Sequence, residues 1–172
     1  MRLLKWVDAV NLAIGRAVGA LVWIGAAILF FEVIARYAFG APTIWAHGYT
    51  QRVFGAYFIL VGAYTLLQGG HVRIDLMLDS AGPRRRACLD ALNYAMLVIW
   101  AAALSYEGWT FFLESWVWNE RDENALAHPL WPPKLALFLG SVLIAVQGLV
   151  ELSYALLRIV HPSLPIAREK PA

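Results

Sequence analysis

The sequence predicts an all-α integral membrane protein with four transmembrane helices and a short amphipathic segment at the cytoplasmic-side interface. Hydrophobic residues make up 60% of the 172 residues, and the mean hydropathy is +0.59. Charged residues make up 15%, which is too little to cover the surface of a soluble domain of this size. Four uncharged stretches reach the membrane-spanning length of about 20 residues once their flanks are included. These stretches are Ala17–Phe31, Val53–Gly70, Ala91–Tyr106 and Leu135–Val150.

The first predicted span covers residues 12–35. At 1.5 Å per residue it is about 36 Å long, so we expect it to tilt in the bilayer. Glu32 and Arg36, near its far end, are one helical turn apart and are expected to pair. Gly40 and Pro42 then break the helix, and Trp45 suits the aromatic belt of the membrane interface.

The second predicted span, residues 51–68, ends at a Gly-Gly pair. The following stretch, His71–Asp79, mixes apolar and charged residues and is too short and too charged to cross a membrane. It predicts an interfacial amphipathic segment. Two interpretations of Arg73 and Asp75 remain open: they lock this segment against neighbouring helices, or they belong to a solvated loop.

The third and fourth predicted spans cover residues 88–106 and 134–157. We expect Pro133 or Lys134 to begin the last helix, because proline is favourable at the first helical position. Gly15–Gly19 and Ala136–Gly140 have the spacing that lets helix backbones approach closely. Residues 1–160 are predicted to form a single four-helix membrane domain, and residues 161–172 a disordered cytoplasmic tail.

The distribution of charge predicts the orientation in the membrane. Basic residues gather at the N-terminus, between the second and third spans and after the fourth span, whereas the loop between the third and fourth spans is net acidic. The positive-inside rule therefore places both termini in the cytoplasm. The basic residues concerned are Arg2, Lys5, Arg73, Arg84, Arg85, Arg86, Arg158, Arg168 and Lys170.

The sequence predicts no catalytic, cofactor-binding or metal-ligating residue. All four histidines lie outside the spans, so no facing pair is available for haem, and the single cysteine, Cys88, excludes an internal disulfide. Glu32 and Glu151 are more informative, since a carboxylate in a membrane helix suggests function by default. They could couple transport to protons, as in four-span small multidrug exporters, or they could be structural.

Several segments occur in a characteristic order along the four-span frame. Glu32–Phe39 closes the first span, and Pro42 and Trp45 follow in the first loop. Gly69–Asp75 follows the second span, Trp131–Lys134 enters the fourth, and Gln147-Gly148 lies within it. Over roughly residues 5–158 the chain resembles the small, DctQ-like membrane subunit of tripartite ATP-independent periplasmic (TRAP) transporters.

This resemblance implies a non-catalytic scaffold subunit in the bacterial inner membrane. Its expected partners are the lipid bilayer, a large multi-spanning membrane subunit that carries substrate and sodium ions, and a periplasmic binding protein that delivers a substrate, typically an organic acid. No nucleic acid is expected as a partner, and no cofactor is expected in this chain. The alternative is an autonomous proton-coupled transporter that works as a homodimer through Glu32 or Glu151. Candidate assembly residues are Glu32, Arg36, Trp45, Arg73, Asp75, Trp131, Lys134, Gln147 and Glu151.

Overall fold

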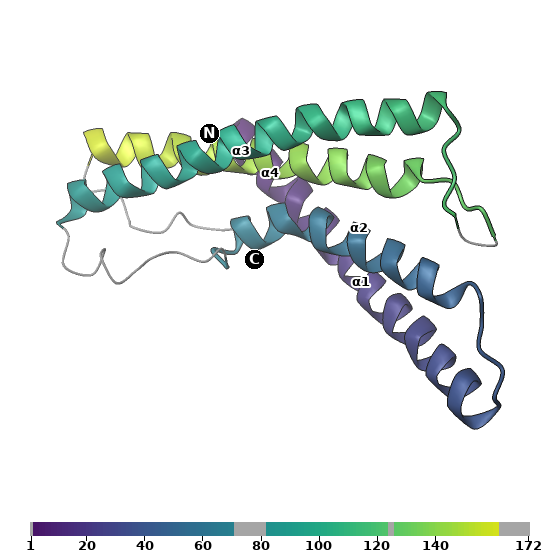
Figure 1. Ribbon diagram of the computed structural model, residues 1–172. Helices are drawn as coiled ribbons and strands as arrows, with labels where there is room; N and C mark the ends of the chain where they lie inside the picture. The colour runs from purple at the N-terminus through teal and green to yellow at the C-terminus, as the bar shows by residue number, and fades with distance from the viewer. Residues whose placement is uncertain (1, 71–81, 124–125, 162–172) are drawn as a thin grey trace.

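A computed structural model describes residues 2–70, 82–123 and 126–161, with side chains from residue 6 onward. Its four α-helices are α1 (Arg2–Ala38), α2 (Ala46–Leu67), α3 (Pro83–Val117) and α4 (Trp131–Val160) (Figure 1). Apart from an isolated bridge between Arg121 and Pro129, the regular secondary structure of these residues is helical. The predicted all-α class is confirmed.

Among the described residues, three segments are long and apolar enough to cross a membrane: Trp6–Ala38, Pro83–Val117 and Trp131–Val160. α2, at about 33 Å, has sufficient length, but His47, Gln51 and Arg52 in its first two turns lower its mean hydropathy. The span predicted at residues 51–68 therefore stays a prediction, as does the division into a membrane domain and a tail. The predicted interfacial segment, with Arg73 and Asp75, and the tail from residue 162 lie outside the described residues.

Helix α2 ends in a Schellman motif, in which a residue with positive φ reverses the chain. Gly69 has φ 74° and donates its N–H to the Leu66 carbonyl at 3.0 Å, while the Gly70 N–H donates to the Thr65 carbonyl at 2.9 Å. Asn119 takes the same place after α3, with φ 46°. Both helices therefore stop sharply, because their last carbonyls are bonded within the turn.

Helix α4 begins at Trp131, so the prediction that Pro133 or Lys134 begins it is wrong by two residues or more. Pro132 and Pro133 lie inside the first turn. The first four N–H groups of a helix have no partner within it, so prolines there cost no hydrogen bond.

The helices form two antiparallel hairpins, α1 with α2 and α3 with α4 (Figure 1). Packing of α2 against α4 joins the two hairpins. Helix α1 contacts α4 near its own N-terminal end and then runs away from the α3–α4 pair (Figure 1). The position of α1 therefore depends on α2 and on the few residues that reach α4.

The contact between α2 and α4 is close because Gly140 has no side chain. A Cβ atom at Gly140 would lie 2.8 Å from the Ile59 carbonyl oxygen, and Ala63, Ala101 and Ile144 form a buried apolar cluster nearby. The predicted small-residue spacing therefore corresponds to a close helix contact at Gly140. Gly15 of α1 makes a second close contact, with the Tyr64 ring of α2, whereas a Cβ at Gly19 would meet nothing within 4 Å.

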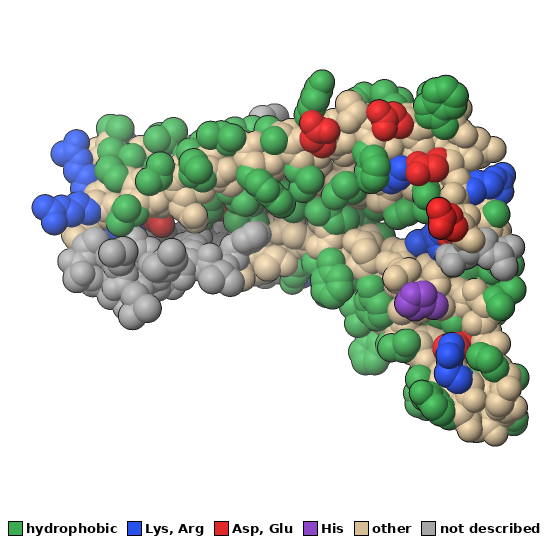
Figure 2. All heavy atoms as spheres, viewed as in Figure 1, with side chains coloured by type: hydrophobic (Ala, Val, Ile, Leu, Met, Phe, Trp, Pro, Cys, Tyr) green, Lys and Arg blue, Asp and Glu red, His purple; other side chains and the backbone are tan. Residues whose placement is uncertain are grey.

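Large apolar side chains remain exposed over much of the surface. On α1, Trp23 is 79% exposed and Phe30 is 68% exposed. On the face shown in Figure 2, hydrophobic side chains cover the middle of the α3–α4 hairpin and charged side chains gather towards the ends. This distribution suits a protein surrounded by lipid or by another membrane subunit.

We predict that Gly140→Ala destabilises the chain by about 1–3 kcal/mol, because the added methyl group overpacks the α2–α4 contact. The measurement is the thermal unfolding midpoint of the purified chain in detergent. Gly19→Ala is the matched control and should leave the midpoint unchanged or raise it. Equal midpoints for the two variants would show that the contact is looser than the geometry indicates.

Candidate functional site

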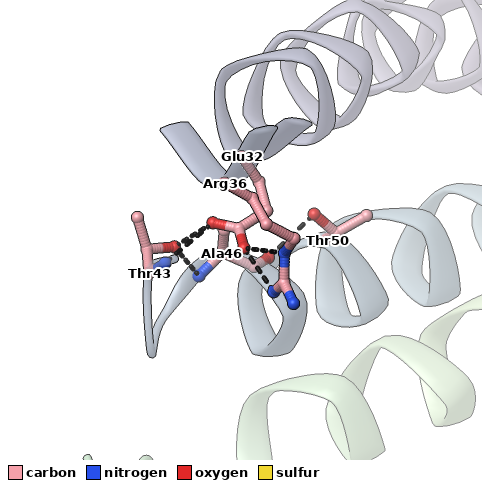
Figure 3. Close-up of polar contacts among 5 residues, drawn as sticks. All are labelled: Glu32, Arg36, Thr43, Ala46 and Thr50. Atoms are coloured by element: carbon pink, nitrogen blue, oxygen red, sulfur yellow. Dashed lines mark hydrogen bonds and ion pairs between the residues drawn. The ribbon is translucent and has the colours of Figure 1, made fainter. Parts of the chain in front are cut away.

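Glu32 organises the connection between α1 and α2 (Figure 3). It is 8% exposed, and its Oε1 accepts hydrogen bonds from Arg36 Nε at 3.0 Å and Arg36 Nη2 at 2.5 Å. Its Oε2 accepts from the Thr43 N–H at 3.1 Å and the Thr43 hydroxyl at 2.5 Å. The Thr43 oxygen in turn accepts the Ala46 N–H at 3.3 Å. The predicted Glu32–Arg36 pair is confirmed, and this Glu32 cluster ties the end of α1 to the first turn of α2.

Trp45 packs within the chain at the same end. Its ring stacks on Phe31 of α1, with centroids 5.8 Å apart, and meets Tyr49 of α2 edge-on at 6.0 Å. Tyr49 also contacts the His128 ring at 4.9 Å, in the loop between α3 and α4. An aromatic chain therefore runs from α1 through α2 to the second hairpin.

An ion pair joins the hairpins beside this aromatic chain. Arg52 of α2 binds the Asp122 carboxylate in the α3–α4 loop. Asp122 also accepts the His128 N–H at 3.0 Å, and its own N–H donates to the His128 carbonyl at 2.9 Å. The loop is thereby folded so that its carboxylate faces α2.

Two predicted assembly residues, Trp131 and Lys134, connect the start of α4 to the end of α3 and the loop after it. Lys134 pairs with Glu120, and its ammonium lies 3.8 Å from the Phe111 ring centroid. Trp131 meets Trp116 edge-on at 5.1 Å. The hydrogen bond from Lys134 lowers the pKa of Glu120 below its ordinary value of 4.5, although desolvation opposes this shift.

A second polar group, the Gln147 cluster, joins α1 to α4 and comprises Asp8, Asn11, Gln147 and Glu151. These side chains are 3%, 2%, 0% and 7% exposed. The Gln147 carbonyl oxygen accepts from Asn11 Nδ2 at 2.7 Å. Its amide nitrogen donates to Asp8 Oδ1 and to Glu151 Oε1, both at 3.2 Å. The structure thus brings together two predicted residues, Gln147 and Glu151, with two that sequence reasoning missed.

Asp90 and Arg158 form a further buried ion pair that sequence reasoning missed. Arg158 Nη1 donates to Asp90 Oδ2 at 2.9 Å, and both side chains are less than a tenth exposed. Asp90 lies 27 residues before the end of α3 at Val117 (117 − 90), and Arg158 lies 27 residues after the start of α4 at Trp131 (158 − 131). In an antiparallel hairpin such residues have the same depth, so this register was a usable signal once the helix limits were known.

The remaining predicted residues, Arg73 and Asp75, lie outside the described residues. Within the ranges that are described, no group of three or more His, Cys, Asp or Glu side chains could hold a metal ion.

Comparison with known families identifies the chain. The profile of the family described as "Tripartite ATP-independent periplasmic transporters, DctQ component" matches residues 25–158. The chain belongs to the DctQ family. It is therefore a TRAP transporter small membrane subunit, as the order of sequence segments predicted. A search of curated proteins found no match. The DctQ match includes the Glu32 cluster, Gln147 and Glu151, but begins after Asp8 and Asn11.

In this DctQ-family chain, Gln147→Leu should lower the free energy of unfolding by about 1–3 kcal/mol, because buried polar partners lose hydrogen bonds. Thermal unfolding of the purified chain measures the change. Gln68→Leu is the matched control, since Gln68 is exposed at the end of α2. Comparable losses in both variants would contradict a specific role for the amide in joining α1 to α4.

A pH dependence follows from the lowered pKa of Glu120. A carboxyl whose pKa is lower in the folded chain stabilises folding above its unfolded value, and this stabilisation is lost as the pH falls through the folded value. The unfolding midpoint should therefore be higher for the wild-type chain than for Glu120→Gln above pH 4.5, and the two should converge at lower pH. Glu123→Gln, at an exposed carboxylate of the same loop, is the control and should follow the wild type throughout.

Proposed function

We propose that this chain is the non-catalytic scaffold subunit of a sodium-gradient-driven TRAP transporter. The transporter imports an organic acid or a similar small solute, which a periplasmic binding protein delivers. The large membrane subunit carries the substrate and the sodium ions. This chain holds a stable helical frame beside it, with both termini in the cytoplasm according to the positive-inside rule.

The observation that carries the proposal is the engagement of Glu32 and Glu151, the two candidate coupling carboxylates, in the chain's own helix contacts. A coupling carboxylate must exchange its proton or its partner during each transport cycle. Glu32 instead accepts four hydrogen bonds from Arg36 and Thr43, in the connection between two helices. Glu151 accepts from Gln147, whose amide also binds α1. These contacts favour a structural role for both groups.

Links between the hairpins also support a scaffold that moves as one unit. Arg52 and Asp122 join them near the start of α2, Gly140 lets α2 and α4 pack closely, and Gln147 joins α1 to α4. The apolar surface of α1, where Trp23 and Phe30 are exposed, remains available for lipid or for the large subunit.

Co-purification tests the scaffold proposal. A tagged chain, solubilised from membranes of its own host with a mild detergent, should bring down a much larger membrane protein. Liposomes containing both should transport, whereas liposomes containing this chain alone should not. Recovery of a homodimer of this chain that transports in liposomes by itself would contradict the proposal and favour the autonomous proton-coupled transporter.

Substitution of the two carboxylates separates the same alternatives. Glu32→Gln and Glu151→Gln should reduce the yield or thermal stability of the complex, with transport per assembled complex close to that of the wild type. The matched control is Glu123→Gln, which should change neither. Full assembly combined with abolished transport would instead assign a coupling role to the carboxylate.

A further inference from the structure

A hollow of about 330 Å³ opens between the end of α1 and the start of α2. This volume is within the range of small-molecule sites. Leu29 and Val33 line it with aliphatic surface, while Glu32, Arg36 and His47 contribute polar groups. The hollow is therefore amphipathic, and its two charged groups are the paired Glu32 and Arg36.

Arg36 retains a donor that the Glu32 cluster does not use. Its Nε and Nη2 bind Glu32, whereas Nη1 has no hydrogen bond among the described residues, and its side chain is half exposed (Figure 3). Both Glu32 oxygens already accept two hydrogen bonds each. The exposed His47 at the same opening adds a second possible donor. An incoming anion would thus meet these donors, because the Glu32 carboxylate in the lining is buried and already bonded to Arg36 and Thr43.

The depth of these groups suggests which anion fits. Leu29, Val33 and Arg36 lie three or four residues apart and so share one face of α1. Arg36 is in the last turn of this candidate membrane span, and the aliphatic residues lie towards its middle. A phospholipid has the same order of groups, with its phosphate at the interface and its acyl chains towards the membrane centre.

We propose that this hollow is a binding site for an anionic phospholipid. Arg36, aided by His47, binds the lipid phosphate, and an acyl chain lies against Leu29 and Val33. The inference is independent of the scaffold role and requires only that α1 crosses the bilayer. By the positive-inside rule, the lipid belongs to the periplasmic leaflet.

Native mass spectrometry of the purified full-length chain in detergent tests the site. The probe is dioleoylphosphatidylglycerol, and the comparison ligands are dioleoylglycerol, which has the same chains without the phosphate, and inorganic phosphate. We expect a phosphatidylglycerol adduct that neither comparison ligand displaces. Equal binding of dioleoylglycerol would overturn the role of the phosphate. Displacement of phosphatidylglycerol by inorganic phosphate would show that the site binds free phosphate rather than a lipid.

Variants assign the adduct to the hollow. Arg36→Gln should weaken binding about fivefold, the change expected for one basic residue at an anionic membrane surface. Val33→Phe should weaken it at least as much by filling the apolar side, while leaving the Glu32–Arg36 pair untouched. Arg121→Gln, at an exposed arginine of the α3–α4 loop, should bind as the wild type does.

Unchanged lipid binding in both Arg36→Gln and Val33→Phe would overturn the proposal. Assembly is measured in parallel by co-purification of the large subunit. The proposal would also be overturned if the Arg36→Gln variant no longer co-purified with the large subunit but still bound lipid as the wild type does. Arg36 Nη1 would then contact protein rather than lipid.

Discussion

Helices in a bilayer have no water with which to satisfy a polar side chain, so any polar group between them must bind another. Gln147 meets this constraint most completely, because it is fully buried and uses both atoms of its amide. It binds Asp8 and Asn11 of α1 and Glu151 of its own helix. Since α1 otherwise diverges from the second hairpin, this network determines where α1 begins against α4.

The opposite end of the frame follows the same constraint with charged groups. Glu32 closes the α1–α2 connection, Arg52 reaches across to Asp122, and Lys134 closes the α3–α4 loop through Glu120. Ionisable residues in membrane proteins usually mark ion or substrate pathways. Here they mark helix junctions.

The predictability of each contact depended on its distance along the chain. Glu32 and Arg36 are four residues apart, so helical periodicity alone identified their pairing. The partners Asn11 and Gln147 are 136 positions apart, and Asp90 and Arg158 are 68 positions apart. No local pattern relates such residues, although Gln147 and Glu151 stood out as polar groups in an apolar span. The start of α4 was misplaced because prolines are tolerated throughout the first turn of a helix.

The sequence by itself determined the all-α membrane class and membership of the DctQ family, because hydropathy and ordered motifs are properties of neighbouring residues. Only the tertiary structure decided which polar groups meet, and why Gly140 is a close contact while Gly19 faces open space. The physical reason is that pairing between helices depends on the tilt and rotation of each helix. Those are set jointly by all the contacts and not by any single segment.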